Sequence, residues 1–283
     1  MKFLEIFSKN IFRLIAGRYL SRLGENSIET TLSRSLNMLD ADSIDEIKSY
    51  IKSQQTRAGG FADRGGKSDL YYSLFGCYIA EALEIEEIKP ALKDYLKKVI
   101  NSQELSGINL KCALILYIKL FGSKTIPSIL LKKDSIAAQY SDFINLLAYY
   151  YTKDYISLFL IRQKLKRNKP NAEMPCSVLS ASLILQHSND KHDEEPWQFM
   201  INYYKKGSFS AFSKTANGDM LSTGVALYAL RFADSDLSII KPDCLTFIDS
   251  LYLDGGFCAT SFDELPDVEY TFYGLLGLGS LAD

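Results

Sequence analysis

The chain has 283 residues, of which 47% are hydrophobic and 23% charged, and its formal net charge is −2. This balance is typical of a folded globular protein and excludes a disordered chain, and the small net charge argues against a nucleic-acid partner. Its five cysteines match neither a zinc knuckle nor a CxxC centre, and their odd number argues against a disulfide framework. We therefore expect a reduced, cytoplasmic protein whose thiols behave as small apolar side chains.

Residues 1–25 are predicted to form an amphipathic helix that precedes a single domain over residues 26–283. Phe3, Phe7 and Ile11 recur at helical spacing, with Lys9 and Arg13 on the other face. Such a helix either packs against the body of the protein or docks on a membrane surface, which would make the protein membrane-associated. Its charges interrupt any secretory signal, and no apolar run is long enough to span a bilayer.

Two kinds of helix are predicted to alternate along the rest of the chain. Apolar helices are expected to begin near Asp69, Asn109, Ile136, Pro175, Asp219 and Asp267. More polar helices are expected over residues 43–54, 90–102, 125–133, 153–166, 194–205 and 238–251, four of them with a proline near the start. No strands are predicted, because residues of alternating polarity are almost absent. Six such pairs predict an all-α fold, a six-hairpin double ring or α/α toroid with apolar inner helices.

Three segments of the chain repeat one pattern, in which a small residue and a phenylalanine precede a polar loop, an aspartate and an apolar helix. The three segments begin at Gly59, Gly207 and Gly255. The last two phenylalanine positions are 48 residues apart. A period of this length is typical of stacked helical pairs. The loops that precede the inner helices are expected at one end of the ring, where we would look for a site.

This repeated unit, together with the segment Gln55–Phe61 (QTRAGGF), resembles the repeat of the prenyltransferase and squalene-cyclase superfamily. That superfamily includes protein prenyltransferase β subunits, squalene and oxidosqualene cyclases, and class II diterpene synthases. The resemblance runs from about residue 40 to the end of the chain, and three of six repeats match well. It implies the toroid fold and an isoprenoid substrate, although one barrel of this type hosts several chemistries.

The family's metal and acid motifs are largely absent. Asp219 stands where protein prenyltransferases have an aspartate ligand of zinc, but Leu221 replaces the cysteine and Tyr270 replaces the histidine. The usual zinc site is therefore not expected. Asp219 and Glu269 remain as candidate ligands of a hard cation such as Mg²⁺, and the cofactor is left unknown. Neither the DxDD motif of squalene-cyclase-type enzymes nor the DDxxD motif of class I terpene synthases occurs.

Three aspartates recur at one position of the repeat, at the start of an inner helix. Asp69, Asp219 and Asp267 are each interpreted either as an N-cap that satisfies free helix N–H groups or as a carboxylate that faces a shared site. The catalytic candidates are Asp219 and Asp267, with Glu269 and Tyr270 beside them. Asp69 is counted with the substrate-binding candidates.

Two further groups complete the substrate-binding candidates. The aromatic residues either line a cavity, where they suit an apolar chain or a carbocation, or pack in the core; they are Tyr71, Tyr72, Tyr228 and Tyr273. The basic residues either bind a diphosphate near helix N-termini or are simply solvated; they are Arg57, Arg64, Lys67 and Lys214.

The leading functional hypothesis is a prenyltransferase-like or terpene-cyclase-like protein that binds an isoprenoid, or its diphosphate, in an aromatic barrel. The alternative is a non-catalytic module that has lost the ancestral site and binds a protein partner. A carbohydrate-active barrel is disfavoured by the single tryptophan, Trp197, and a thioester domain by the lack of a CGEQ string. An open aromatic cavity beneath Asp219 and Asp267 would favour an enzyme, and a plugged barrel would favour the module.

Overall fold

The computed structural model describes residues 23–102, 104–132, 141–160, 173–187 and 196–283, and these form an all-α protein. Six apolar helices lie in its interior: α4 (Leu70–Ala82), α6 (Gly107–Phe121), α7 (Ser141–Thr152), α9 (Cys176–His187), α11 (Met220–Phe232) and α13 (Val268–Leu281). Around them lie α3 (Ala41–Ser53), α5 (Lys89–Ser102), α10 (Pro196–Met200) and α12 (Lys241–Asp249). Short 3-10 turns lie at Leu36–Met38, Glu86–Ile88 and Ser128–Leu131.

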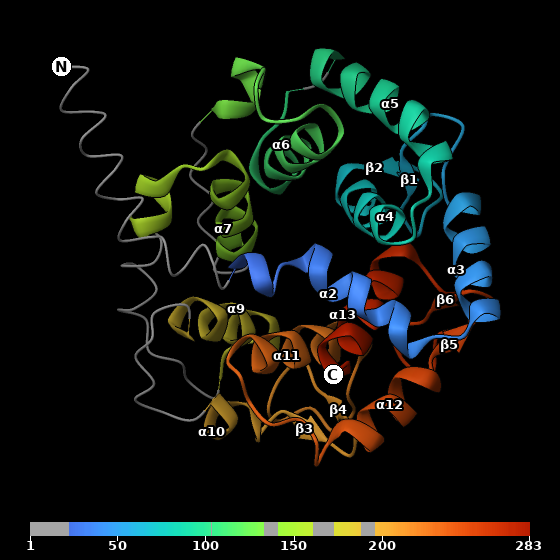
Figure 1. The fold of residues 1–283 in the computed structure, drawn as a ribbon, viewed down its shortest axis with the longest axis vertical. Coiled ribbons are helices and arrows are strands. Elements are labelled where there is room, and N and C mark those ends of the chain that lie inside the picture. Colours follow the sequence, from blue (N-terminus) through green and yellow to red (C-terminus); the bar gives the residue numbers. More distant parts are fainter. Residues whose placement is uncertain (1–22, 103, 133–140, 161–172, 188–195) are drawn as a thin grey trace.

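The inner helices stand side by side around the middle of the molecule (Figure 1). Helix α4 contacts α6 and α13, helix α6 contacts α7, and helix α11 contacts both α13 and α9. The composition of the helices explains the two layers. Twelve of the 14 residues of α13 are buried, whereas in α3 only Ile47 and Ile51 are, among 13. A helix that is apolar on all sides must be surrounded by other helices, whereas a helix with one apolar stripe needs a neighbour on that side only.

Five of the predicted inner helices begin within two residues of their expected positions, and the sixth expected start, Ile136, lies outside the described residues. The predicted outer helices are less regular. Residues 128–131 form only a 3-10 turn, and α10 has five residues, where longer helices were expected. The predicted amphipathic helix over residues 1–25 lies almost entirely outside the described residues. Within the described residues, no helix is long and apolar enough to cross a membrane.

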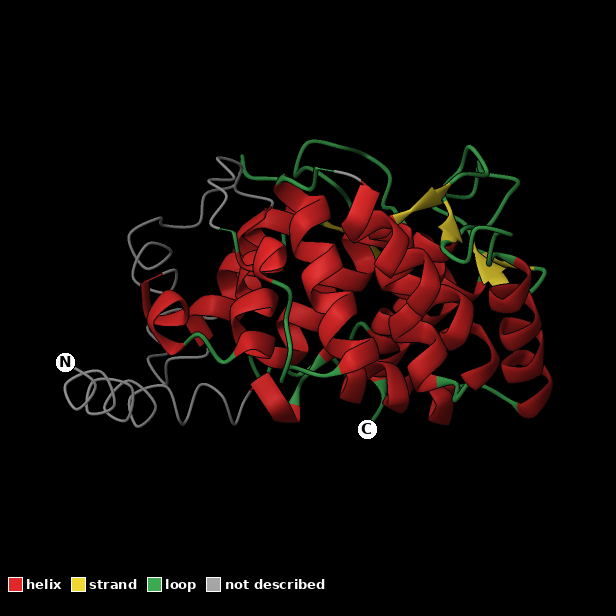
Figure 2. Ribbon diagram, turned by 90° about the horizontal axis from the view of Figure 1, so that it is seen from above, coloured by secondary structure: helices red, strands yellow, loops and turns green. Residues whose placement is uncertain are grey.

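The prediction of no strands is wrong in detail, because each of the three repeats contains a two-stranded antiparallel ribbon. The ribbons pair β1 (Phe61–Ala62) with β2 (Ser68–Asp69), β3 (Tyr204–Lys205) with β4 (Ser208–Phe209), and β5 (Tyr252–Leu253) with β6 (Gly256–Phe257). Strands of two residues are too short to produce an alternating pattern in the sequence. All three ribbons lie along one edge of the molecule, here called the loop end (Figure 2).

One hydrogen bond recurs in all three repeats and ties the ribbon to its inner helix. The backbone N–H of Phe61 donates to the hydroxyl of Ser73 at 2.9 Å. The N–H groups of Phe209 and Phe257 donate in the same way to Thr223 and Thr271, at 2.9 and 3.1 Å. A buried N–H without a partner is costly, so this hydroxyl on the first turn of the helix fixes where the loop returns to the core.

A glycine with positive φ follows three of the outer helices, α3, α10 and α12, and packs against another outer helix. Gly59, Gly207 and Gly255 have φ values of 95°, 90° and 83°. A Cβ added to Gly255 would lie 2.5 Å from the backbone oxygen of Glu46 in α3, and one at Gly59 would lie 2.2 Å from that of Ala91 in α5. Glycine is therefore required both by the left-handed backbone and by the close approach. The loop after α12, the last outer helix, thus packs against α3, the first.

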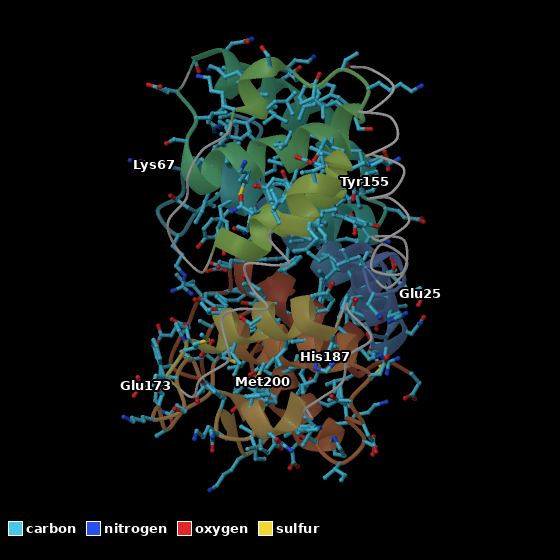
Figure 3. All side chains as sticks on the ribbon, turned by 90° about the vertical axis from the view of Figure 1, so that its left-hand side faces the viewer. Glu25, Lys67, Tyr155, Glu173, His187 and Met200 are labelled. Atoms are coloured by element: carbon cyan, nitrogen blue, oxygen red, sulfur yellow. The ribbon has the colours of Figure 1, made fainter. Side chains whose placement is uncertain are left out.

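Helix α2 (Ile28–Ser35) was not predicted, and it lies across the end of the inner helices that is opposite the loop end. It contacts α13 and α4. A Cβ at Gly279 would lie only 1.8 Å from the backbone oxygen of Thr31, so the glycine allows the two helices to touch. Figure 3 shows Glu25, just before α2, on the edge opposite Lys67 of the loop end.

A buried ion network joins α2 to the inner helices. The Lys119 ammonium is only 5% exposed and lies 2.7 Å from Glu29 of α2 and 2.6 Å from Glu81 of α4. Tyr151 also donates a hydrogen bond to Glu29, and its hydroxyl lies 2.9 Å from that of Tyr78. Burial raises the pKa of Glu29, but Lys119 and the hydrogen bonds outweigh burial and hold that pKa below its ordinary value. The network therefore keeps the carboxylate ionised.

Candidate functional site

The inner helices enclose a cavity, here called the central cavity, with a volume of about 70 Å³. Residues from α2, α4, α7, α9, α11 and α13 line it: Ile28, Tyr71, Leu74, Phe75, Tyr78, Ile144, Leu147, Ser177, Ser180, Ala181, Ile184, Val225, Tyr228, Phe272, Tyr273 and Leu276. No residue of this described lining is charged. This space is large enough for several water molecules or for a segment of a hydrocarbon chain.

Aromatic rings from α4 and α13 form one continuous wall of the central cavity. The ring of Phe75 lies 4.5 Å from those of Tyr71 and Phe272, and Tyr78 lies 5.9 Å from Phe272. Tilted and edge-on pairs at these separations are favourable and hold the rings in place. Because the rings already pack against one another, the wall is preformed.

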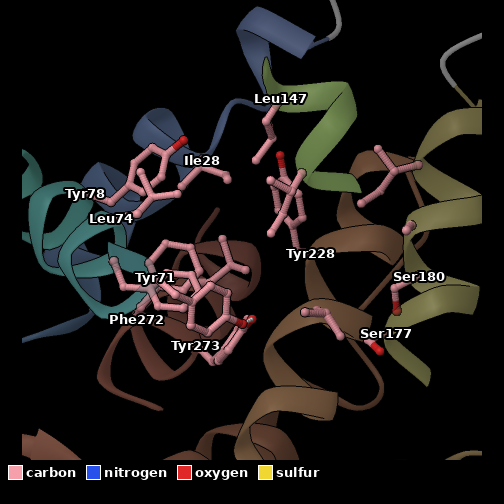
Figure 4. A pocket seen from close by; sticks show the side chains of 16 residues that line it. Ile28, Tyr71, Leu74, Tyr78, Leu147, Ser177, Ser180, Tyr228, Phe272 and Tyr273 are labelled. Atoms are coloured by element: carbon pink, nitrogen blue, oxygen red, sulfur yellow. Dashed lines mark hydrogen bonds between the residues drawn. The ribbon is translucent and has the colours of Figure 1, made fainter. Parts of the chain in front are cut away.

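The opposite wall of the central cavity is built from smaller side chains. Ser177, Ser180 and Ala181 of α9 face the aromatic wall, with Tyr228 of α11 between them (Figure 4). Ile28 of α2 lies among the lining residues, so the unpredicted helix forms part of the cavity. The space is left because small side chains stand across from large ones.

A polar cluster lies at the loop end, where the loop of the first repeat meets the helix start of the last. Arg64 donates from Nε to Asp267 at 2.7 Å, lies 3.6 Å from Asp263, and stacks over the ring of Tyr270 at 5.0 Å. The hydrogen bond to Asp267 raises the pKa of Arg64 above its already high value. Burial raises the pKa of Tyr270 to about 12. Two catalytic candidates, Asp267 and Tyr270, are thus brought together by a basic substrate-binding candidate.

Glu269 links this cluster to the central cavity. The hydroxyl of Tyr71, which lines the cavity, donates to the Glu269 carboxylate at 3.1 Å and lies 3.5 Å from the hydroxyl of Tyr273. Burial raises the pKa of Glu269, and the charge of Asp267 adds to the rise, against hydrogen bonds from Tyr71 and Tyr72. Burial also raises the pKa of Tyr72. Glu269 is therefore a carboxyl group that holds its proton more tightly than usual, one hydrogen bond behind the cavity wall.

All three recurring aspartates are N-caps. Asp69 accepts from the N–H groups of Tyr71 and Tyr72, Asp219 from that of Ser222, and Asp267 from that of Tyr270. Asp219 also accepts a hydrogen bond from the Ser222 hydroxyl at 2.8 Å. Burial raises the pKa of Asp219. None of the three lines the central cavity, so the capping interpretation accounts for their recurrence.

The basic candidates of the loop end do not reach the central cavity. Arg57, Arg64, Lys67 and Lys214 are exposed on the loops, and Arg64 is bound to Asp267. Of the aromatic candidates, Tyr71, Tyr228 and Tyr273 line the cavity and Tyr72 lies beside Glu269. Among the described residues, no group of three histidine, cysteine, aspartate or glutamate side chains is arranged to hold a metal ion.

Sequence reasoning missed several residues of the cavity. Phe75 and Tyr78 lie one and two turns after Tyr71 in the same inner helix, and this spacing could have indicated a shared face. Ser177 and Ser180 gave a weaker signal, a pair of hydroxyls spaced three residues apart within an apolar helix. Burial raises the pKa of the nearby Cys176 thiol to about 12, which fits the expected inert thiol.

Comparison with known proteins adds no family to this description. No family model matches the chain, and no curated protein matches it significantly.

Proposed function

We propose that the described helices belong to a closed α/α toroid whose central cavity binds an isoprenoid or a similarly apolar chain. Two contacts support the closure of the ring. The loop at Gly255 packs against α3 as the loop at Gly59 packs against α5, and α13 contacts α4. The last repeat therefore meets the first in both layers, which leaves no exposed terminal repeat.

The aromatic central cavity is the observation that carries the proposed ligand. An apolar chain gains free energy by leaving water for the rings of Tyr71, Phe75 and Phe272, and the preformed wall reduces the ordering cost of binding. The faces of these rings also attract a developing cation. Glu269 is the carboxyl group that we assign to acid–base chemistry at this site, because burial raises its pKa and Tyr71 of the cavity wall donates a hydrogen bond to it. The proposal is thus a prenyltransferase-like or terpene-cyclase-like protein.

The test is calorimetric titration with geranyl, farnesyl and geranylgeranyl alcohols and diphosphates, on the native chain and on a variant with a filled cavity. Val225→Trp places a large side chain into the cavity from α11 and is expected to abolish binding. Ile239→Trp is the control, because Ile239 is 87% exposed and does not line the cavity. If no chain length binds at high micromolar concentration, or if Val225→Trp binds as well as the native chain, the proposal is wrong.

A non-catalytic module is the second candidate function, and the capping aspartates favour it. The carboxylates of Asp219 and Asp267 accept hydrogen bonds from helix N–H groups, and Asp267 is also paired with Arg64. Phe262 and Leu265 of the last loop are 80% and 77% exposed at the loop end, as a protein-binding surface would require. Native mass spectrometry of the chain purified from its source cell would test this candidate: a stoichiometric partner lost on Phe262→Ser supports it, and a monomer contradicts it.

A further inference from the structure

Within the described residues, the hydroxyl of Ser180 is the buried polar group of the central cavity that has no oxygen or nitrogen hydrogen-bond partner. Ser180 is 1% exposed and lines the cavity, and within the described part of the chain no group binds its oxygen. The Cys176 thiol is close, but its own hydrogen bond goes to the backbone oxygen of Ser222, and a thiol sulfur is a weak acceptor. A buried hydroxyl without an oxygen or nitrogen partner is costly in the empty protein.

Ser182, on the same helix, shows what an ordinary buried serine does. Its hydroxyl donates to the backbone oxygen of Val178 at 2.9 Å, one turn earlier, and it is 4% exposed. Ser182 does not line the cavity. The two serines therefore differ in two respects: only Ser180 lines the cavity (Figure 4), and only its hydroxyl lacks a hydrogen-bond partner among the described residues.

The tyrosine hydroxyls of the cavity are already engaged, and Ser177, the other serine of the lining, is only partly buried. Tyr71 donates to Glu269 and Tyr228 donates to the backbone oxygen of Asn26. The hydroxyl of Tyr78 pairs with Tyr151, and that of Tyr273 lies against Tyr71. The Ser180 hydroxyl on α9 is therefore the group that can bind a polar atom of a ligand in the cavity.

The lack of a cation in the lining argues against a diphosphate in the same space. Behind the wall stand Glu269, next to Tyr71, and Lys119 with its partners Glu29 and Glu81, next to Tyr78. The lining itself supplies no cation among the described residues. A multiply charged group in the cavity would lose its hydration without a compensating cation in the lining.

We propose that the central cavity takes an uncharged apolar chain that carries a single hydroxyl or comparable oxygen, and that Ser180 binds this oxygen. The inference rests on the proposed function for the binding of the ligand's apolar chain, and it adds the ligand's polar head group and the residue that binds it. It replaces the diphosphate that the basic residues of the loop end had suggested. The aromatic wall holds the chain, and Ser180, across the cavity, selects the oxygen.

The experiment compares three probes that share one carbon skeleton: farnesol, farnesyl diphosphate and the hydrocarbon farnesane. Each competes with the neutral dye N-phenyl-1-naphthylamine for the native chain, Ser180→Ala and Ser182→Ala. On the native chain, farnesol is expected to bind about two- to tenfold more tightly than farnesane, the range for one net hydrogen bond. Farnesyl diphosphate is expected to bind more weakly than farnesol.

Ser180→Ala is expected to erase the advantage of farnesol over farnesane and to leave the affinity for farnesane unchanged. Ser182→Ala is expected to keep the advantage. An advantage that survives Ser180→Ala, or tighter binding of the diphosphate than of the alcohol, overturns the inference while leaving chain binding intact. If no probe binds, the proposed function itself is wrong and the inference falls with it. Ser180→Thr keeps the hydroxyl and is expected to retain the preference for farnesol, which separates loss of the oxygen contact from misfolding.

Discussion

Arg64 Nε donates a 2.7 Å hydrogen bond to Asp267 Oδ2, although the two residues are 203 positions apart in the chain. The contact joins the loop of the first repeat to the helix start of the last. Asp267 does two things at once, since its other oxygen caps α13 through the N–H of Tyr270. The two ends of the repeat array are thus held together at the loop end by one carboxylate.

Substitution of Asp267 separates its two interactions. Asp267→Asn keeps a good N-cap and loses the charge, so we expect it to lower the free energy of unfolding by about 0.5–1 kcal/mol, because Arg64 is half exposed. Asp267→Ala loses both and is expected to cost about 2 kcal/mol. Urea denaturation in low and high salt measures the free energy of unfolding of both variants and the part that depends on charge. Asp219→Asn is the matched control, a cap that forms no ion pair with another described residue, and an equal loss there would contradict the assignment.

Glu269 is expected to make stability fall as pH rises. Its pKa is raised by burial in the folded protein, so between the ordinary value of 4.5 and the higher folded value the folded state binds more protons than the unfolded state. The contribution of Glu269 is therefore fully present below pH 4.5 and is lost as pH rises through the folded pKa. Glu269→Gln removes this loss.

Urea midpoints of the native chain and Glu269→Gln, measured between pH 4 and pH 7, check the sign. The urea midpoint of Glu269→Gln is expected to rise relative to that of the native chain as pH rises. A difference that stays constant with pH, or that shrinks, would show that the pKa of Glu269 is not raised. Glu264→Gln, at an exposed position in the loop that precedes α13, is the control for a general effect of charge.

Local signals made the inner helices predictable, and long-range contacts explain the rest. An aspartate cap followed by an apolar run predicts the starts of α11 and α13 to within one residue, because capping involves only neighbours in sequence. The pairing of Arg64 with Asp267 depends on how the repeats curve around, which no local pattern encodes. The free hydroxyl of Ser180 likewise depends on what α4 and α13 place across from α9. Helix α2 was missed because its eight residues are mostly polar, and its position depends on Gly279.

Lys119 is expected to be the strongest single charge contribution to stability. Lys119→Met leaves Glu29 and Glu81 without their shared cation, and we expect a loss of roughly 2–3 kcal/mol, less than for a fully buried pair because the carboxylates are 35% and 28% exposed. Lys97→Met is the control, since Lys97 and its partner Asp94 are mostly exposed and worth at most about 0.5 kcal/mol. Chemical denaturation of both variants gives the comparison, and equal losses would mean that the network adds nothing.

Gly279 is expected to control the docking of α2. Gly279→Ala would gain about 1 kcal/mol of helix propensity in isolation, but its Cβ meets the backbone of Thr31 at 1.8 Å and must displace α2. We expect a net loss of about 1–2 kcal/mol and weaker binding in the central cavity, because Ile28 of α2 lines it. At Gly277 the nearest atom is the flexible end of Ile248 at 3.1 Å, so Gly277→Ala should be close to neutral. Thermal unfolding that ranks the two variants in the opposite order would contradict the close contact.

Ser180 and Ser182 are expected to respond in opposite directions to the same substitution in the ligand-free protein. Ser180→Ala removes a buried hydroxyl without a partner, so the free energy of unfolding should rise by about 0.5–1 kcal/mol. Ser182→Ala removes a hydroxyl that is bonded to Val178, so stability should stay level or fall by about 0.5 kcal/mol. Urea denaturation without ligand measures both. A loss of 1 kcal/mol or more on Ser180→Ala would contradict the assignment of an unsatisfied hydroxyl.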